Sequence, residues 1–379
     1  MSAPGQTAGL SVFTDPLIAE LEVSRTAISF SYLIGTLVGA AALPFVGRAL
    51  DRWGVRGATV VIAVAFAGFL AGLSFVSELV GLTAGFIGVR MAGQGALSLA
   101  ATTLVARTIT HRRGLALGAA TAMGSGGISL APVLLESMIA SWGIQTVWRL
   151  EAAAVLLVVV PIALLLPRRR SREATTVVTA GADRPAPGPV WTLGQAVRTS
   201  MFWVLAAGVA TSGMLGTALA FHQISVLGAQ GLSPAEAAAN FLPQTVTGIL
   251  ATLLTGAVAD RIAPKFGVTF AMVTLAAALL LLPAVSPGVS AVVYGLVLGA
   301  ATGSLRGLEA AAYVRYYGTT HIGAIRGVAT AISLASTAVG PVLLSVGHDA
   351  AGGYRLPVLL LAVLPVTVAV LSVFARAPR

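Results

Sequence analysis

A few ionisable side chains stand inside long apolar runs of this sequence. Arg90 lies in the run 80–106, roughly 15 Å from its start at 1.5 Å per residue. Arg306 and Glu309 lie three residues apart in the run 288–312, so they share one face of a helix. Charge in a membrane interior is costly unless it meets a partner, a cavity or a substrate. These residues are therefore candidates for an ion or substrate pathway.

Each candidate also has a purely structural explanation. Arg90 would then donate only to backbone carbonyls, and Arg306 and Glu309 would only neutralise each other. His222, beside Gln223 at the end of the run 199–224, changes charge near neutral pH and is a candidate proton carrier. Its structural alternative is a hydrogen bond at the membrane interface. The sequence leaves both explanations open for all four side chains.

Patterns that would indicate an enzyme are absent from the sequence. There is no cysteine, the four histidines are scattered, and neither His-Glu-x-x-His nor a phosphate-loop pattern occurs. We therefore expect no enzymatic activity, no metal site and no cofactor.

The elements that carry these charges must be membrane helices. The 379 residues are 57% hydrophobic and only 9% charged, and the mean hydropathy is +0.92. Soluble domains carry about 25% charged residues. The net charge of +10 lies in short turns without interleaved aromatic residues, which disfavours nucleic acid as a partner. The lipid bilayer is the expected environment.

Apolar runs long enough to cross a bilayer recur along the chain. Twelve spans are predicted, at 7–22, 26–48, 57–77, 80–106, 114–138, 144–167, 199–224, 234–258, 266–285, 288–312, 323–346 and 353–375. The first is short and has no basic flank, which suggests that the chain begins inside helix 1, with a naturally short and tilted helix as the alternative. Arginines follow the even-numbered spans, so these ends and both termini are predicted to be cytoplasmic. A multi-pass protein of the cell membrane is expected.

The second half of the sequence repeats the first at an offset of 209 residues. Asp260-Arg261 then falls on Asp51-Arg52, Ser233 falls on Ser24, and the Pro-Val-Leu-Leu segment 341–344 falls on 132–135. Because six spans is an even number, the two copies have parallel topology. The predicted domains are a six-helix half at 1–167, a polar, proline-rich and glycine-rich cytoplasmic linker at 168–198, and a six-helix half at 199–379.

The corner between spans two and three carries a charged motif. The pattern is Gly-x-x-x-Asp-Arg-x-Gly-x-Arg, at Gly47, Asp51, Arg52, Gly54 and Arg56. It resembles the cytoplasmic loop motif of the major facilitator superfamily, and a weaker copy keeps Gly256, Asp260 and Arg261. The resemblance implies that fold over the whole chain, an all-α membrane protein of two parallel halves. It also implies that these eight residues form a cytoplasmic gate, with simple topology anchors as the alternative.

A second likeness lies in span four, where Arg90, Gln94 and the glycines of RMAGQG resemble the family's helix-4 motif. The resemblance implies that this arginine takes part in proton transfer or in binding an anionic substrate. The segment 9–39 has a weaker resemblance to monocarboxylate and oxalate/formate-type carriers, although span eight lacks the arginine typical of them. The Gly-Pro pair of drug/proton antiporters is missing from span five.

The resemblance implies a secondary active transporter for a small organic solute, with a carboxylate anion as the expected substrate. Alternating access driven by a proton or solute gradient is the expected mechanism. A multidrug/proton antiporter is one alternative, and a receptor or sensor with the carrier fold is another. A monomer is the expected functional unit.

Overall fold

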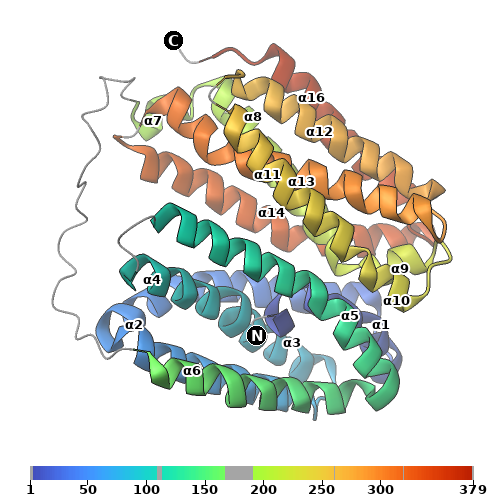
Figure 1. The fold of residues 1–379 in the computed structure, drawn as a ribbon. Helices are drawn as coiled ribbons and strands as arrows, with labels where there is room; N and C mark the ends of the chain where they lie inside the picture. The colour runs from blue at the N-terminus through green and yellow to red at the C-terminus, as the bar shows by residue number, and fades with distance from the viewer. Residues whose placement is uncertain (1–2, 109–112, 167–190, 260, 319, 378–379) are drawn as a thin grey trace. The chain divides into compact units, whose positions relative to one another are not determined.

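The computed structural model describes residues 3–108, 113–166, 191–259, 261–318 and 320–377, and no strand occurs among them (Figure 1). Most of the predicted linker, 168–198, lies outside these residues, so its boundaries stay a prediction. The chain divides into two compact units. One consists of Met1–Val178 with Ala220–Ser225, and the other of Thr179–Leu219 with Val226–Arg379.

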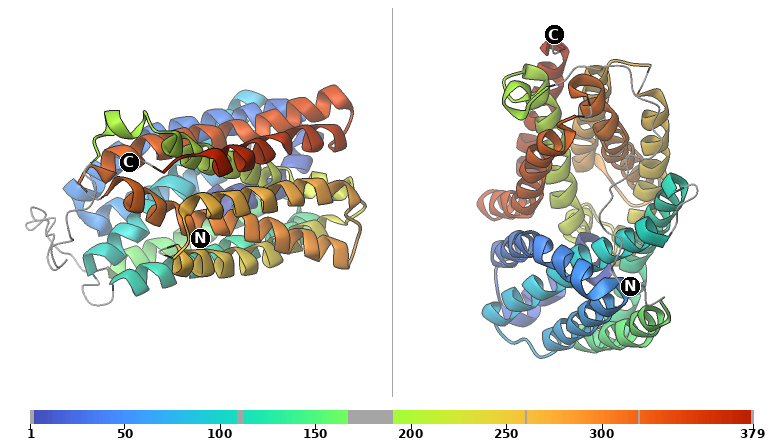
Figure 2. Two further views of the ribbon diagram at one scale, coloured as in Figure 1. Left: turned by 90° about the horizontal axis from the view of Figure 1, so that it is seen from above. Right: turned by 90° about the vertical axis from the view of Figure 1, so that its left-hand side faces the viewer.

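Helices make up both units, and the two views of Figure 2 show those of each unit running alongside one another. Residues before the linker form η1 (Ala3–Gly5), α1 (Thr7–Leu21), α2 (Arg25–Leu73), α3 (Leu79–Val89), η2 (Arg90–Leu97), α4 (Ser98–Thr108), α5 (Arg113–Ala154), η3 (Val155–Val159) and α6 (Val160–Leu165). A short helix within the predicted linker is α7 (Leu193–Ala196), and the residues after the linker form α8 (Ser200–Phe221), α9 (Gln223–Gly228), α10 (Pro234–Ala239), α11 (Phe241–Val258), α12 (Pro264–Leu281), η4 (Leu282–Ala284), α13 (Val289–Tyr317), α14 (Ile322–Ala351), α15 (Arg355–Leu361) and α16 (Val363–Phe374).

Eight helices among the described residues are long and apolar enough to cross a membrane. Two of them, α2 and the helix over 122–165, are each a pair of helices joined at a glycine, Gly54 and Gly143. The short α1 and the continuous column α3–η2–α4 complete the twelve predicted spans.

The charged corner between spans two and three is tighter than the sequence suggested. We expected a turn over 49–56, between the spans 26–48 and 57–77, but the helix runs through it and departs from helical geometry only at Gly54, with φ 75° and ψ 162°. A positive φ is strained for residues with a side chain, so glycine makes this abrupt change of direction possible.

The internal repeat is visible in local conformation. Ser24 and Ser233, 209 residues apart, each cap a helix, accepting a hydrogen bond from the backbone nitrogen of Ala27 and of Glu236 respectively. Gly143 and its equivalent Gly352 both have positive φ, at 74° and 66°. Equivalent positions thus start and break helices in both copies, as a duplication requires.

In the second unit, α11 and α13 pack at backbone distance. A side-chain carbon at Gly299, Gly303 or Gly307 of α13 would collide with the backbone of α11. The approach allows Thr252 Oγ1 to donate to the Gly303 carbonyl oxygen at 3.0 Å. Small residues four apart permit this kind of helix contact in membranes, where the hydrophobic effect between helices is weak.

Gly303→Ala should therefore destabilise the protein. The added methyl group meets the carbonyl and Cα of Gly248, so the helices must separate, at a cost of about 1–3 kcal/mol. Thermal unfolding in detergent should show a lowered midpoint. The control is Gly327→Ala in α14, where a methyl group has open space around it. Equal midpoints for the two variants would contradict the packing account.

Candidate functional site

Two glycines bring α2 close to α3 and η2 in the first unit. Gly35 and Gly39 lie one turn apart, and a side chain on either would crowd the backbone at Phe86 or at Met91. Close backbone approach through a Gly-x-x-x-Gly pattern is common between membrane helices. The result is that Thr36, between the two glycines, lies within reach of Arg90.

The helix changes its winding where Arg90 begins η2. Residues 90–97 form a π-helix between two α-helical stretches, so that each carbonyl bonds to an amide five residues on. Such wide turns are rare and frequently occur at functional sites. Arg90 and Gln94 both lie in this segment.

The Arg90 side chain is buried, with only 4% of its surface exposed. Its Nε donates to Thr36 Oγ1 at 3.1 Å, and its Nη1 donates to the Gly5 carbonyl oxygen at 3.2 Å and to Thr7 Oγ1 at 3.4 Å. The structure thus supports part of the structural explanation of this residue, since one partner is a backbone carbonyl.

Tyr32 connects the partners of Arg90 into one network. The guanidinium carbon lies 4.4 Å from the centre of the Tyr32 ring, a cation–π contact. The Tyr32 hydroxyl lies 2.7 Å from Thr7 Oγ1, and the Tyr32 carbonyl oxygen accepts a hydrogen bond from Thr36 Oγ1 at 2.8 Å. The guanidinium of Arg90 therefore contacts two threonine hydroxyls, one backbone carbonyl and one aromatic ring, all of them neutral.

The positive charge of Arg90 has no acidic counterpart in the described part of the chain. None of the ion pairs there includes this side chain, and its Nη2 makes no hydrogen bond. The buried Oε1 of Gln94 has no hydrogen-bond partner either. A site with an uncompensated cation, a free N–H donor and a free amide oxygen can accept an anion that also carries a donor.

The other charged candidates make no hydrogen bond with Arg90 in the described part of the chain. Arg306 is exposed and Glu309 half-buried on α13, and no ion pair joins them, so they do not neutralise each other by direct contact. His222 is buried at 1% exposure, and its Nε2 lies 3.3 Å from Ser29 Oγ within the first unit.

The charged corner places its residues at a helix junction. Asp51 and Arg52 are exposed at the end of the first helix of α2, on the same stretch as Gly47. Arg56 Nη1 lies 3.4 Å from the Leu166 carbonyl oxygen, beyond the end of α6. Its repeat equivalent Lys265 has Nζ 3.5 Å from the Val373 carbonyl oxygen in α16. In both copies a basic side chain therefore binds the free carbonyls at a helix C-terminus.

The second corner has a further anchor that sequence reasoning missed. Arg315 Nη1 donates to the carbonyl oxygens of Ala259 and Ile262, at 3.0 and 2.7 Å. These carbonyls belong to residues on either side of Asp260, which itself lies outside the described residues. Of the other two predicted gate residues of this corner, Arg261 is exposed and Gly256 lies within α11. The signal was available, because Arg315 follows a predicted span closely in the sequence, as Arg261 does.

Comparison with known proteins identifies the family. The sequence model of the Major Facilitator Superfamily matches residues 2–293. The chain belongs to this superfamily. It is a multi-pass membrane protein and a secondary transporter, and not an enzyme. The predicted family and the predicted twelve-helix, all-α fold are confirmed.

Solved structures of similar fold include a bacterial homologue of the human lysosomal transporter Spinster. Its inward-facing occupied form matches with a TM-score of 0.71 and its unoccupied form with 0.73, each at 16% identity. Each match covers 98% of this chain and 94% of the other. At this identity the likeness concerns the fold alone. No curated protein sequence matches the chain.

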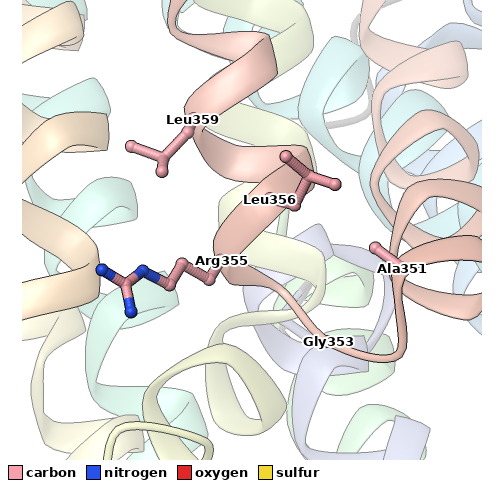
Figure 3. Close-up of a pocket in the computed structure, with 5 residues that line it drawn as sticks. All are labelled: Ala351, Gly353, Arg355, Leu356 and Leu359. Carbon is pink, nitrogen blue, oxygen red and sulfur yellow. The ribbon is translucent and has the colours of Figure 1, made fainter.

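This superfamily member also has a surface hollow at the α14–α15 turn of the second unit (Figure 3). Its lining comprises Ala351, Gly353, Arg355, Leu356 and Leu359. None of the predicted site residues lies there. We assign no role in transport to this hollow.

Three partners of Arg90 in this transporter were not singled out from the sequence. Thr7, Tyr32 and Thr36 surround the guanidinium, although they lie 54 or more positions before it in the chain. The Gly-x-x-x-Gly pattern around Thr36 was the available signal, because it marks a close helix contact with a hydroxyl inside it.

Proposed function

We propose that this transporter carries a small organic carboxylate across the cell membrane by alternating access, driven by a proton gradient. The observation that carries the proposal is the buried guanidinium of Arg90 with neutral partners only. A lone buried cation is costly, and an anion that enters beside it relieves the cost.

The chemistry of Arg90 and Gln94 favours a carboxylate over other anions. A guanidinium pairs with the two oxygens of a carboxylate through parallel hydrogen bonds. The free amide oxygen of Gln94 needs an N–H or O–H donor, which a hydroxy acid or a half-protonated dicarboxylate would supply. A cationic drug could donate to the Gln94 oxygen but would be repelled by the guanidinium of Arg90.

The charged corners serve as the cytoplasmic gate in this proposal. Gly47, Asp51, Arg52, Gly54 and Arg56 form the main latch, and Gly256, Asp260 and Arg261 form the weaker one. Ion pairs and helix-end contacts there stabilise one state of the transport cycle. Both termini are cytoplasmic in this account, and a monomer suffices for transport.

The remaining candidates belong to the proton or substrate pathway. Glu309 and Arg306 are charged groups inside a span, and His222 is a buried titratable group beside a hydroxyl. Ionisable groups at such depth commonly serve as steps of proton or ion pathways.

A panel of labelled solutes tests the substrate class. Purified protein in proteoliposomes is given mono- and dicarboxylates, amino acids, sugars and cationic dyes, and initial uptake is compared with protein-free vesicles. Uptake of carboxylates, competed by other carboxylates, is expected. Movement of dyes alone would indicate a multidrug/proton antiporter, and no movement of any solute would favour a receptor or sensor. Either outcome overturns the proposal.

A further inference from the structure

Glu151 is a buried acid that neither the motifs nor the family resemblance points to. It lies in the second helix of α5, after the break at Gly143, within the candidate span 122–165. Only 8% of the residue is exposed, and its Oε2 has no hydrogen-bond partner. An unpartnered carboxylate is costly in an apolar interior, so this side chain needs a proton or a cation.

A second unsatisfied polar group lies one turn away on the same helix face. Trp148, three residues before Glu151, is fully buried, and its indole Nε1 has no hydrogen-bond partner. Its ring stacks on Phe13 of α1, with ring centres 3.7 Å apart, which fixes the indole in place. One helix face thus carries a buried donor, Trp148 Nε1, and a buried acceptor, Glu151 Oε2, neither of which has a hydrogen-bond partner. A buried polar group without a partner destabilises the folded state.

The backbone next to Glu151 is unusual as well. The π-helix η3 begins at Val155, four residues on, just as η2 begins at Arg90. Arg90 thus lies within a wide turn, and Glu151 lies about one helical turn before another; such turns recur at functional sites.

The neighbouring ionisable groups have partners of their own. Elements packed against α5 are α1, α2, α4, η1 and η3, and neither η1 nor η3 carries an ionisable side chain. Arg25 binds Asp15 at 2.7 Å, and Glu20 accepts a hydrogen bond from Gln145. On α5 itself, Arg149 Nε donates to Ser74 Oγ at 3.1 Å.

Other ionisable side chains on these elements make no hydrogen bond or ion pair with Glu151 in the described structure. They are Tyr32, Arg48, Asp51, Arg52 and Arg56 of α2, and Glu136 of α5. The side chains of Arg107 and Arg113, and residues 1 and 2 with the chain's amino group, lie outside the described part.

From this geometry we infer that Glu151 is the group that binds the transported proton. An O–H bond forms when the carboxylate takes a proton from the acidic side, and the same bond breaks when the proton leaves to water on the other side. The neutral acid is the form suited to the apolar interior, so the proton is carried while the site is closed to water. This inference rests on the proposed proton coupling.

The first test uses Trp148 as a built-in reporter and requires no substrate. A variant keeps this tryptophan and replaces the other four with phenylalanine, at Trp53, Trp142, Trp191 and Trp203. Its emission is recorded in lipid nanodiscs across a pH range. We expect a single-proton transition that disappears when Glu151→Gln is added. Two results would overturn the inference: a transition that persists after Glu151→Gln is added, or the absence of any transition in the single-tryptophan protein that keeps Glu151.

The second test separates proton coupling from substrate binding. Glu151→Gln mimics the neutral acid, so exchange of labelled for unlabelled carboxylate should continue at a rate within about threefold of the native rate. Accumulation driven by a pH gradient should be lost, and the exchange rate should no longer depend on pH. Glu151→Asp, which restores a carboxyl group, should recover part of the accumulation. Full accumulation by the glutamine variant would contradict the role.

The two proposals can fail independently. If the native protein carries no carboxylate and Trp148 still reports the Glu151 transition, the substrate class is wrong and the proton site stands. If carboxylate uptake follows the pH gradient and the glutamine variant is unaffected, the substrate class stands and Glu151 is structural.

Discussion

Replacing Arg90 with glutamine should abolish carboxylate binding while leaving the protein folded. Glutamine retains hydrogen-bonding capacity toward Thr36 but removes the buried positive charge. Truncating one member of a buried charge pair costs about 2–5 kcal/mol, which corresponds to a loss of affinity of roughly 30-fold or more. Binding is measured by the rise in unfolding temperature with added carboxylate.

Arg90→Lys distinguishes charge from geometry. Lysine keeps the positive charge but has no planar fork for two carboxylate oxygens, so weakened binding with some uptake is expected. The matched control is Arg149→Gln in α5, an exposed arginine of the same unit that donates to Ser74. Native affinity in Arg90→Gln, or equal losses in both glutamine variants, would show that Arg90 serves only to hold helices together.

Asp51→Asn should slow transport without weakening substrate binding. Asp51 is exposed beside Arg52 at the end of the first helix of α2, several turns along that helix from Thr36, which binds Arg90. Charge-assisted hydrogen bonds contribute about 1.5–3 kcal/mol each, so loss of one that stabilises a single state of the cycle should change turnover by roughly tenfold. Initial uptake rates at matched protein amounts measure the effect.

A control for Asp51→Asn is the same change at Asp349, near the end of α14, whose Oδ1 lies 3.0 Å from Nδ1 of His348. It removes a carboxylate charge from a residue that belongs to neither charged corner, and it should leave uptake near the native rate. Unchanged turnover in Asp51→Asn, with native expression, would reduce the corner to a topology anchor.

The fold was largely predictable because the relevant signals are local. Ser24 and Ser233 carry the cap side chain that starts a helix, and Gly143 and Gly352 supply positive φ where helices break. The hydrocarbon thickness then sets the length of each span. The long α2 was less predictable, because one glycine conformation at Gly54 replaced the turn that we expected.

The surroundings of the site were harder to predict than the site residue itself. Arg90 stands out in the sequence as a charge deep in an apolar run, but its partners come from helices packed in three dimensions. The π-helix at 90–97 depends on that packing and has no clear sequence signature. Glu151 was visible as an acid within a predicted span, yet only its burial and its lack of a partner distinguish it from an interfacial residue.

The most direct measurement is accumulation of a labelled carboxylate by native protein in proteoliposomes under an imposed pH gradient. The outside is made more acidic by one pH unit, a proton gradient of about 1.4 kcal/mol. Electroneutral co-transport of the carboxylate with one proton should then concentrate the solute inside by about tenfold, because this free energy sustains a tenfold concentration ratio. Collapse of the gradient by an ionophore should release it. Equal concentrations inside and outside under the gradient, while exchange of the same carboxylate is rapid, would contradict proton-driven transport.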